Sequence, residues 1–396
     1  MATELFCSMR NPGITVEQRV SQIRSSKTVY LPGLNGLRAL AALAVVISHI
    51  TLGLGEFGLN SKILGTDRDG NASGLLLAGY GVTIFFTLSG FLITFLLLKE
   101  KEMTGYVRVK DFYVRRILRI WPLYYLYFLV CIVTILSYGI SFSKNSIPFY
   151  VFLAANIPFI LGKTLPFLAH YWSLGVEEQF YLFFPQLAKQ SNKNLLKMAV
   201  ALIVILLSIK FFFWVLYRKY DLELPFLSLS VTRFHTMLIG VVGAILYYYK
   251  QNRFFLLATN KLTQICSWAC IFLVAINKFH VISAIDNELI SVVSLFLIMG
   301  QVTKRNSLIN LENKACDFIG KISYGIYVIH PILIFYFARL LGHFTETIAN
   351  YLLLYFLLIS ATIFLAYLSY EFYEKKFLKA KAKYTTVKSA NTKNSS

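Results

Sequence analysis

Residues 34–54 read LNGLRALAALAVVISHITLGL and decide the fold class of this chain. The stretch has the length and apolar character of a membrane-spanning helix, which needs roughly 20 such residues, yet it carries Arg38 and His49. At about 100° per residue the two side chains lie about 20° apart on one stripe of the helix, separated by about 16 Å along its axis. Ionisable groups at membrane depth face the protein interior and mark function, so the stripe predicts a polar path through the membrane.

The composition favours a membrane protein over a soluble one. Hydrophobic residues make up 57% of the 396-residue chain, and its mean hydropathy is +0.61, which is high for a soluble domain. The net charge of +20 resides in Lys and Arg between the apolar segments rather than along one face, so we expect no nucleic-acid partner. The cysteine and histidine spacings match no metal-ligand pattern, so we expect no metal and no tightly bound cofactor.

Apolar runs of spanning length predict an all-α polytopic membrane protein with about ten transmembrane helices. We place them at residues 34–54, 75–98, 120–142, 172–188, 198–217, 232–249, 262–277, 288–303, 322–341 and 347–370. Most Lys and Arg residues flank these runs on one side. The opposite side holds Lys62, Arg68, Lys144, Lys163, Arg218, Lys219 and Lys278. Because positive charge accumulates in cytoplasmic loops, this asymmetry predicts cytoplasmic N- and C-termini in a multi-pass protein of the cytoplasmic membrane.

The segments outside the spans complete the predicted organisation. Residues 148–162 (PFYVFLAANIPFILG) are short and interrupted by Pro158, so we interpret them as a re-entrant or interfacial element on the outer side. Residues 1–29 are predicted to be a cytosolic lead-in and residues 30–375 the membrane domain. The polar and basic residues 376–396 are predicted to form a disordered cytosolic tail.

Carboxylates and arginines supply further candidate groups. Glu177 and Glu178 fall within the fourth span, and two adjacent carboxylates cannot both face lipid cheaply. One of them is expected to point into the bundle, where it can orient an imidazole such as His49. Arg115, Arg116 and Arg119 form a cationic cluster suited to bidentate phosphate contacts. The alternative interpretation of this cluster is positive-inside anchoring of the helix.

Two other spans carry isolated polar groups. Arg233 begins the sixth span, and Tyr324 and His330 lie in the ninth. His330 precedes Pro331, so an alternative to a functional role is a hydrogen bond to a backbone carbonyl that the proline leaves free.

Several stretches, taken in this order, resemble the membrane-bound acyltransferase 3 family over residues 30–377. They are LPGLNGLRALAALAVVISHI (31–50), FFTLSGFLIT (85–94), FYVRRILRIWPLYYLY (112–127), HYWSLGVEEQFYLFFP (170–185), TRFHTMLIG (232–240), ISYGIYVIHPIL (322–333) and LSYEFYEKKF (368–377). Any one stretch is a weak signal, and the ordered set is a strong one.

The resemblance implies transfer of an acyl group, usually acetyl, from cytoplasmic acyl-CoA to a hydroxyl of a cell-surface or exported glycan. The expected partners are therefore acyl-CoA, a glycan or lipid-linked sugar, and the lipid bilayer. The resemblance also implies roles for individual residues. His49 is the essential imidazole, Arg38 its motif partner, Arg116 and Arg119 the Arg-x-x-Arg pair, and Glu177 the carboxylate of the WSL-x-x-E pattern, while Trp172, Ser173, Glu178, Arg233, Tyr324 and His330 are supporting or substrate-contacting groups.

The sequence departs from the family pattern at three places. The acidic residue common before Gly-Leu-Arg is Asn35 here, and the acid expected shortly after Arg233 is replaced by His235 or Thr236. Lys376 stands where a proline is expected after Glu374. The first departure weakens the expectation that a carboxylate holds Arg38.

Two alternatives stay open at the level of sequence. Within acyl transfer, His49 is either the general base for the acceptor hydroxyl or a nucleophile that carries the acyl group itself. From a different class, a transporter or flippase for a lipid-linked glycan or small anion would use Arg38, His49 and Glu177 as a substrate relay. A transporter needs no acyl donor, which separates the two classes.

Overall fold

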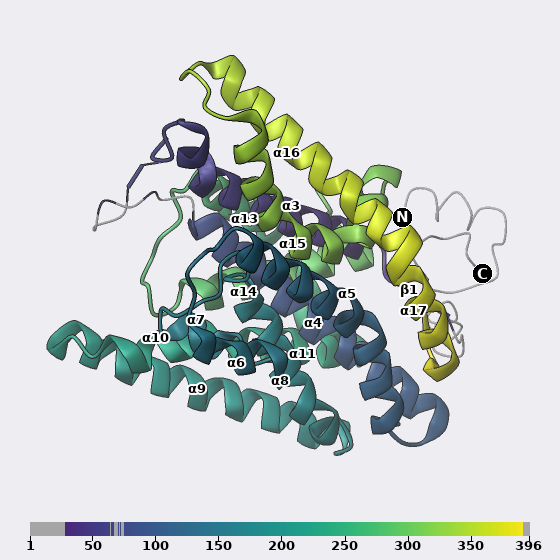
Figure 1. Ribbon diagram of the computed structural model, residues 1–396. Helices are drawn as coiled ribbons and strands as arrows, with labels where there is room; N and C mark the ends of the chain where they lie inside the picture. The colour runs from purple at the N-terminus through teal and green to yellow at the C-terminus, as the bar shows by residue number, and fades with distance from the viewer. Residues whose placement is uncertain (1–27, 64, 67–69, 71, 73–74, 391–396) are drawn as a thin grey trace.

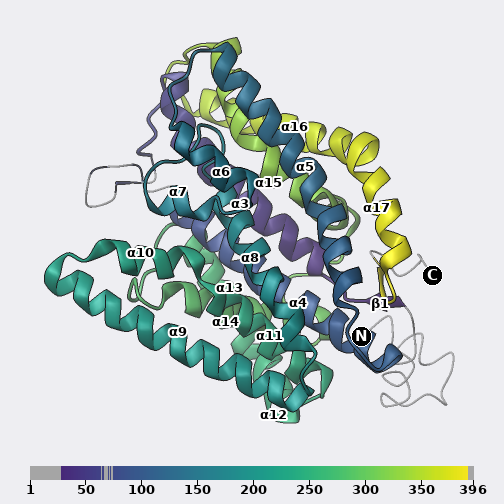
Figure 2. The same ribbon diagram turned by 60° about the horizontal axis from the view of Figure 1, so that its bottom comes forward.

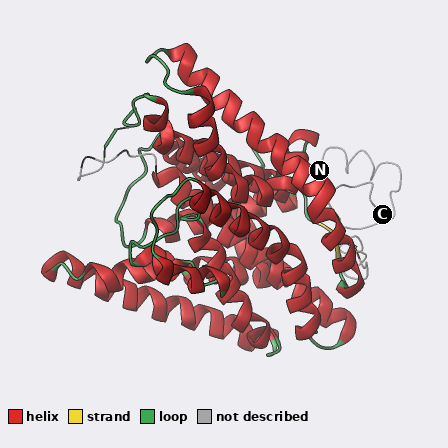
Figure 3. Cartoon of the chain, viewed as in Figure 1, coloured by secondary structure: helices red, strands yellow, loops and turns green. Residues whose placement is uncertain are grey.

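The chain is almost entirely helical in the computed structural model, which describes residues 28–63, 65–66, 70, 72 and 75–390 (Figure 3). Within those residues, the named strands are β1 (Thr28–Tyr30) and β2 (Lys388–Ala390). They pair in parallel, with Val29 opposite Ser389. Strands from opposite ends of the described chain therefore lie side by side.

The helices follow one another with short connections. In chain order they are α3 (Leu34–Gly53), η1 (Leu54–Phe57), α4 (Leu75–Thr104), α5 (Val109–Ser137), η2 (Lys144–Ser146), α6 (Ile147–Val151), α7 (Asn156–Ile160), α8 (Tyr171–Ala188), α9 (Asn192–Tyr220), α10 (Glu223–Thr232), α11 (Phe234–Tyr248), α12 (Asn252–Ala258), α13 (Lys261–Ala275), α14 (Asp286–Thr303), α15 (Lys314–Leu341), α16 (Ile348–Ser369), the π-helical turn η3 (Tyr370–Glu374), α17 (Lys375–Lys381) and η4 (Ala382–Tyr384).

Each of the ten predicted spans coincides with a helix, and the chain is a multi-pass membrane protein by its helices and apolar content. Among the described residues, seven helical stretches are long and apolar enough to cross a bilayer, or eight if α12 and α13, bent by 52°, form one broken span. Helices α8 and α14 have 18 residues each and include charged side chains. The count of ten and the side on which the termini lie stay predictions.

The helices at the centre of the bundle are more deeply buried than those at its edge. Figures 1 and 2 show α9 and α16 on opposite outer edges, with α3, α4 and α15 between them. In the most hydrophobic 18-residue stretch of α9 only 11% of the residues are buried, whereas 72% are buried in the corresponding stretch of α4. Apolar side chains so exposed on a membrane helix suit contact with lipid, whereas α4 packs on protein along most of its length.

Helices α4 and α11 approach until their backbones touch. A Cβ added at Gly90 would collide with the backbone oxygen of Met237, and one added at Gly240 would collide with that of Thr87. Small residues permit such close packing where the hydrophobic effect does not drive helices together. Both glycines belong to stretches that carry the family resemblance, so part of that signal encodes packing.

Two predicted segments are better defined by the structure. Residues 148–162 contain α6 and α7, helices of five residues each and too short to span a bilayer; their re-entrant character stays a prediction. Residues 376–390 form most of α17, then η4 and β2, so up to residue 390 the predicted disordered tail is instead folded against α5. We call residues 375–390 the C-terminal segment. Residues 391–396 and 1–27 lie outside the described residues.

Candidate active site

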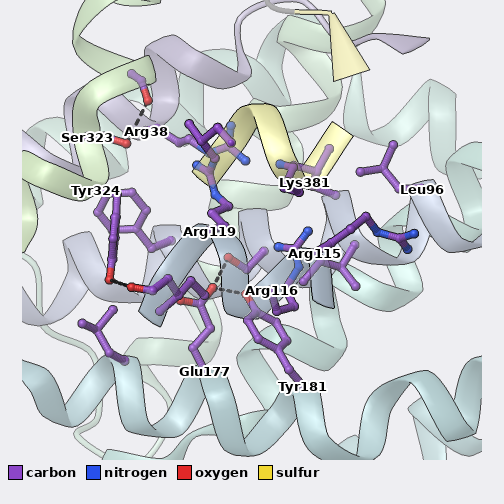
Figure 4. Close-up of a pocket in the computed structure, with 18 of the residues that line it drawn as sticks. Arg38, Leu96, Arg115, Arg116, Arg119, Glu177, Tyr181, Ser323, Tyr324 and Lys381 are labelled. Carbon is purple, nitrogen blue, oxygen red and sulfur yellow. Dashed lines mark hydrogen bonds between the residues drawn. The ribbon is translucent and has the colours of Figure 1, made fainter. Parts of the chain in front are cut away.

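A cavity of about 450 Å³ lies where the first part of α3, the N-terminal half of α5 and the C-terminal segment meet (Figure 4). Its charged lining is mostly cationic. The cations are Arg38, Arg115, Arg116, Arg119, Lys321 and Lys381, and the carboxylates are Glu100 and Glu177. We call this space the basic cavity. A pocket of this size with converging arginines suits a phosphate-bearing ligand.

Arg115 differs from its neighbours because its charge is already neutralised. Its Nη2 lies 2.8 Å from Oε2 of Glu100, and both side chains are buried. Its Nη1 donates to the carbonyl oxygen of Tyr384, also at 2.8 Å. Arg115 therefore fastens the C-terminal segment to α4 and α5.

Arg116 and Arg119 differ from Arg115 in forming no ion pair among the described residues. Among the described residues, neither has a carboxylate within salt-bridge distance. The Arg116 guanidinium lies 5.6 Å from the ring centres of both Phe112 and Tyr181, and its buried Nε has no hydrogen-bond partner there. Because α5 begins at Val109, both arginines project from inside a helix rather than from a loop. An anion entering the basic cavity would meet these two groups.

Arg38 reaches the same cavity from α3, held by a different kind of contact. Its Nη1 lies 3.4 Å from Oδ1 of Asn35, and Nδ2 of Asn35 lies 3.4 Å from Oδ1 of Asp317 on α15. The acidic group missing at residue 35 is thus supplied one step away by another helix. Arg38 keeps an amide rather than a carboxylate as its neighbour.

The two adjacent glutamates have different surroundings. Glu177 lines the basic cavity and accepts hydrogen bonds from Ser89 and Tyr181. Glu178 accepts from Nε1 of Trp121 at 2.9 Å, and its other oxygen is buried without a described partner. We expected a carboxylate beside His49, but no such contact occurs among the described residues. Glu177 faces the arginines instead (Figure 4).

His49 lies in a second cluster that consists of three imidazoles. Its Nδ1 is 2.6 Å from Nε2 of His330, and the two ring planes are inclined by only 25° with centres 4.9 Å apart. The ring of His170 lies 5.4 Å from that of His330, and Nε2 of His170 is 3.2 Å from the carbonyl oxygen of Val328. We call His49, His170 and His330 the histidine cluster.

A pair of hydroxyls separates the basic cavity from the histidine cluster. Ser173 and Tyr327 line the cavity, and their side-chain oxygens lie 2.6 Å apart. The Tyr327 hydroxyl also donates to the backbone oxygen of His170 at 2.8 Å. Tyr324, one turn before, lines the cavity and donates to the backbone oxygen of Ile120 at 2.7 Å. The cavity thus extends inward until it meets the residues that support the imidazoles.

Arg233 and Trp172 belong to neither cluster. The Arg233 guanidinium lies 5.1 Å from the Trp172 ring centre, and its Nη1 donates to Oδ1 of Asn287 at 2.7 Å. Next to it, the buried Glu288 carboxylate contacts Nζ of Lys210 at 2.7 Å and Nε2 of His235 at 2.5 Å. The acid expected after Arg233 is therefore provided by α14. These bonds join α4, α9, α11 and α14 through polar groups.

Sequence reasoning missed two contributors to these clusters. Lys381 was assigned to a solvated tail, although it lines the basic cavity. His170 is not among the predicted site residues, yet it is only 3% exposed and belongs to the histidine cluster. Its place two residues before the WSL-x-x-E pattern was the available signal, because the start of α8 fixes its side chain against α15.

A comparison with known families decides which group the chain belongs to. The family model described as an acyltransferase domain matches residues 31–371. The chain belongs to this acyltransferase family. The resemblance predicted from the ordered motifs is therefore confirmed. The histidine cluster falls within the matched residues, and so does the basic cavity apart from the lining that the C-terminal segment provides.

Curated relatives of this family member come from Staphylococcus aureus. One, from strain COL, has a name that provisionally calls it an O-acetyltransferase; it is 32% identical over 391 residues, covering 89% of the chain and 58% of the relative. O-acetyltransferase OatA of strain NCTC 8325 / PS 47 is 28% identical over 338 residues, covering 77% of the chain and 51% of the relative. The chain thus spans little more than half the length of these relatives. No solved structure was found to match it.

Proposed function

We propose that this chain is an integral membrane O-acyltransferase that moves an acyl group, acetyl in the first instance, from acyl-CoA to a hydroxyl of a cell-surface or exported glycan. The observation that carries the proposal is the basic cavity, in which neither Arg116 nor Arg119 has a carboxylate within salt-bridge distance among the described residues. Family membership supports acyl transfer, and the names of the two relatives support acetyl and a hydroxyl acceptor.

The charge of the basic cavity fits the phosphate end of coenzyme A. Arg116, Arg119 and Lys381 would contact the phosphates, since guanidinium groups bind phosphate oxygens in bidentate fashion. Arg38, Ser173 and Tyr327 line the same space, and the pantetheine arm would lead the thioester toward them. On this reading the basic cavity faces the cytoplasm, as the distribution of Lys and Arg predicts.

His49 would supply the proton chemistry. As a general base its free ring nitrogen takes the proton of the acceptor hydroxyl, while the hydroxyl oxygen forms a bond to the acyl carbon and the carbon–sulfur bond of the thioester breaks. The coenzyme A thiolate then recovers that proton. If His49 is instead the nucleophile, the same nitrogen bonds to the acyl carbon as the carbon–sulfur bond breaks and the coenzyme A thiolate leaves. The hydroxyl oxygen then bonds to that carbon as the carbon–nitrogen bond breaks, and the hydroxyl proton passes to the thiolate.

Inverted membrane vesicles from cells that express the chain test the proposal. Labelled acetyl-CoA is added outside, and labelled acetyl is sought in extracted glycans as an ester released by mild alkali. We expect labelled ester and free coenzyme A from the wild-type chain and neither from His49→Ala vesicles with equal protein content. Glycan translocation that proceeds without acetyl-CoA and yields no ester would favour the transporter and overturn the proposal.

A further inference from the structure

The histidine cluster has hydrogen-bond geometry that fixes where its protons lie. His330 is almost fully buried, and its Nδ1 lies 3.2 Å from the backbone oxygen of Ile326. A carbonyl oxygen only accepts hydrogen bonds, so Nδ1 of His330 must carry the hydrogen. In a neutral imidazole the other nitrogen is then a bare acceptor.

The same reasoning determines which nitrogen of His49 carries the hydrogen. Nε2 of His330 is the bare nitrogen, and it lies 2.6 Å from Nδ1 of His49. For that contact to be a hydrogen bond, His49 must donate from Nδ1. The hydrogens therefore run from His49 to His330 to the Ile326 carbonyl, and Nε2 of His49 keeps its lone pair.

We propose that His330 is a positioning residue that holds His49 as the Nδ1–H tautomer and so makes Nε2 its reactive nitrogen. This inference rests on the proposed function, because it names the atom that would take the acceptor proton or accept the acyl group. His330 performs the orienting part of the role that a carboxylate has in a Ser-His-Asp triad. It brings no negative charge, which suits a site enclosed by apolar helices because an unpaired buried carboxylate is costly.

The arrangement also accounts for the place of His330 in its helix. Residue 331 is proline, which lacks an N–H and leaves one carbonyl of α15 without its helical donor. Repair of this backbone defect alone would not require a partner on another helix. The contact with His49, which is 281 residues away, gives the imidazole a second partner on α3 and ties α15 to the Arg38–His49 stripe.

Substitutions at His330 that differ in hydrogen-bonding ability test the inference. The amide oxygen of His330→Gln can still accept from Nδ1 of His49, whereas His330→Leu has no acceptor and the thioether of His330→Met accepts only weakly. We expect kcat for acyl transfer to fall about 10²-fold or more in the apolar variants and to stay within about tenfold of wild type in His330→Gln. Donor KM should remain within about twofold in all three, because His330 does not line the basic cavity.

A purely structural role predicts the opposite order, because Leu and Met fill an apolar site better than Gln. Equal or higher kcat in His330→Leu than in His330→Gln would therefore overturn the inference, with vesicle protein content and the thermal midpoint in detergent measured alongside. If His330→Leu fails to insert, His330→Met against His330→Gln decides. Failure of the proposed function is distinguishable, because the wild-type chain would then yield no labelled ester, whereas an inactive His49→Ala with an active His330→Leu removes only the role of His330.

Discussion

The basic cavity and the histidine cluster solve the problem of polar groups in a membrane domain in different ways. In the cavity, Arg116 and Arg119 keep their charges without described acidic partners and face a space large enough for a ligand. In the cluster, His49 bonds to His330, and His330 and His170 each bond to a backbone oxygen, with no described carboxylate in contact. Uncompensated charge is suited to binding an anion, and a chain of neutral imidazoles is suited to handling a proton.

The division between binding and chemistry predicts the largest effect at His49. His49→Ala should reduce acyl transfer by about 10²–10⁴-fold, the usual contribution of a general base. Insertion should be normal, because alanine suits an apolar helix. The readout is coenzyme A release, with Ser48→Ala on the same helix as control. Activity of His49→Ala within twofold of wild type would mean that the histidine cluster does not carry the chemistry, so the two regions would not divide binding from chemistry.

A second prediction separates Arg115 from its neighbours within the basic cavity. Removing one partner of a buried ion pair costs about 3–5 kcal/mol, so Arg115→Gln and Glu100→Gln should each lower the thermal midpoint clearly. Replacing both partners should lower it less than the two single losses combined. A midpoint unchanged in Glu100→Gln would show that this pair does not fasten the C-terminal segment.

The neighbouring arginines should show the reverse behaviour. The double variant Arg116→Gln/Arg119→Gln should raise the donor KM about tenfold or more with a smaller change in kcat, which is the mark of lost uniform binding. Arg339→Gln is a matched control, because Arg339 stacks on Phe335 away from the cavity. An unchanged donor KM with an inverted topology would instead support the anchoring role of this cluster.

Substitution of Glu177 tests whether a carboxylate of the basic cavity also interacts with His49. A carboxylate in contact with His49 would move the acidic limb of the pH–rate profile by about one unit or more when replaced. Glu177 contacts Ser89 and Tyr181 instead, so Glu177→Gln should leave that limb in place even if the rate falls. A shift of the limb in Glu177→Gln, and none in Glu178→Gln, would mean that Glu177 reaches His49 during turnover.

The smallest predicted effect concerns Lys381. Lys381→Ala should raise the donor KM about twofold to fivefold, the range of a partly exposed charge contact, and added salt should reduce the difference. Lys379→Ala on the same helix is the control, since Lys379 is exposed and outside the cavity lining. Equal effects of both variants would point to general surface charge rather than to a contact in the cavity.

Local pattern and ordered motifs made much of this arrangement predictable. Each apolar run of spanning length is a helix, because backbone groups in lipid must bond within their own segment. The partner of His49 was not predictable in this way. Helical periodicity places Arg38 and His49 on one stripe, but His330 approaches from a helix far along the chain, and no local rule pairs them.

Two other errors share a physical cause. Glu177 was paired with His49 because both lie in polar positions of their spans, yet it bonds to Ser89 of α4 as well as to Tyr181 on its own helix. The C-terminal segment looked disordered because its sequence is polar and basic, yet Arg115 holds the Tyr384 carbonyl and draws the segment onto α5. Both depend on tertiary contacts that composition does not encode.

The seam between α4 and α11 restricts how an acceptor can reach His49. Where Gly90 and Gly240 bring the two backbones into contact, no side chain that could rotate aside lies between the helices. At this point the two helices would therefore move as one rigid unit. We expect no lateral gate at this point for a lipid-linked sugar, the acceptor class proposed above. The route of the acceptor to His49 would then run past other helices. Gly90 and Gly240 would thus contribute both to the family resemblance and to a tight helix contact that the acceptor does not cross.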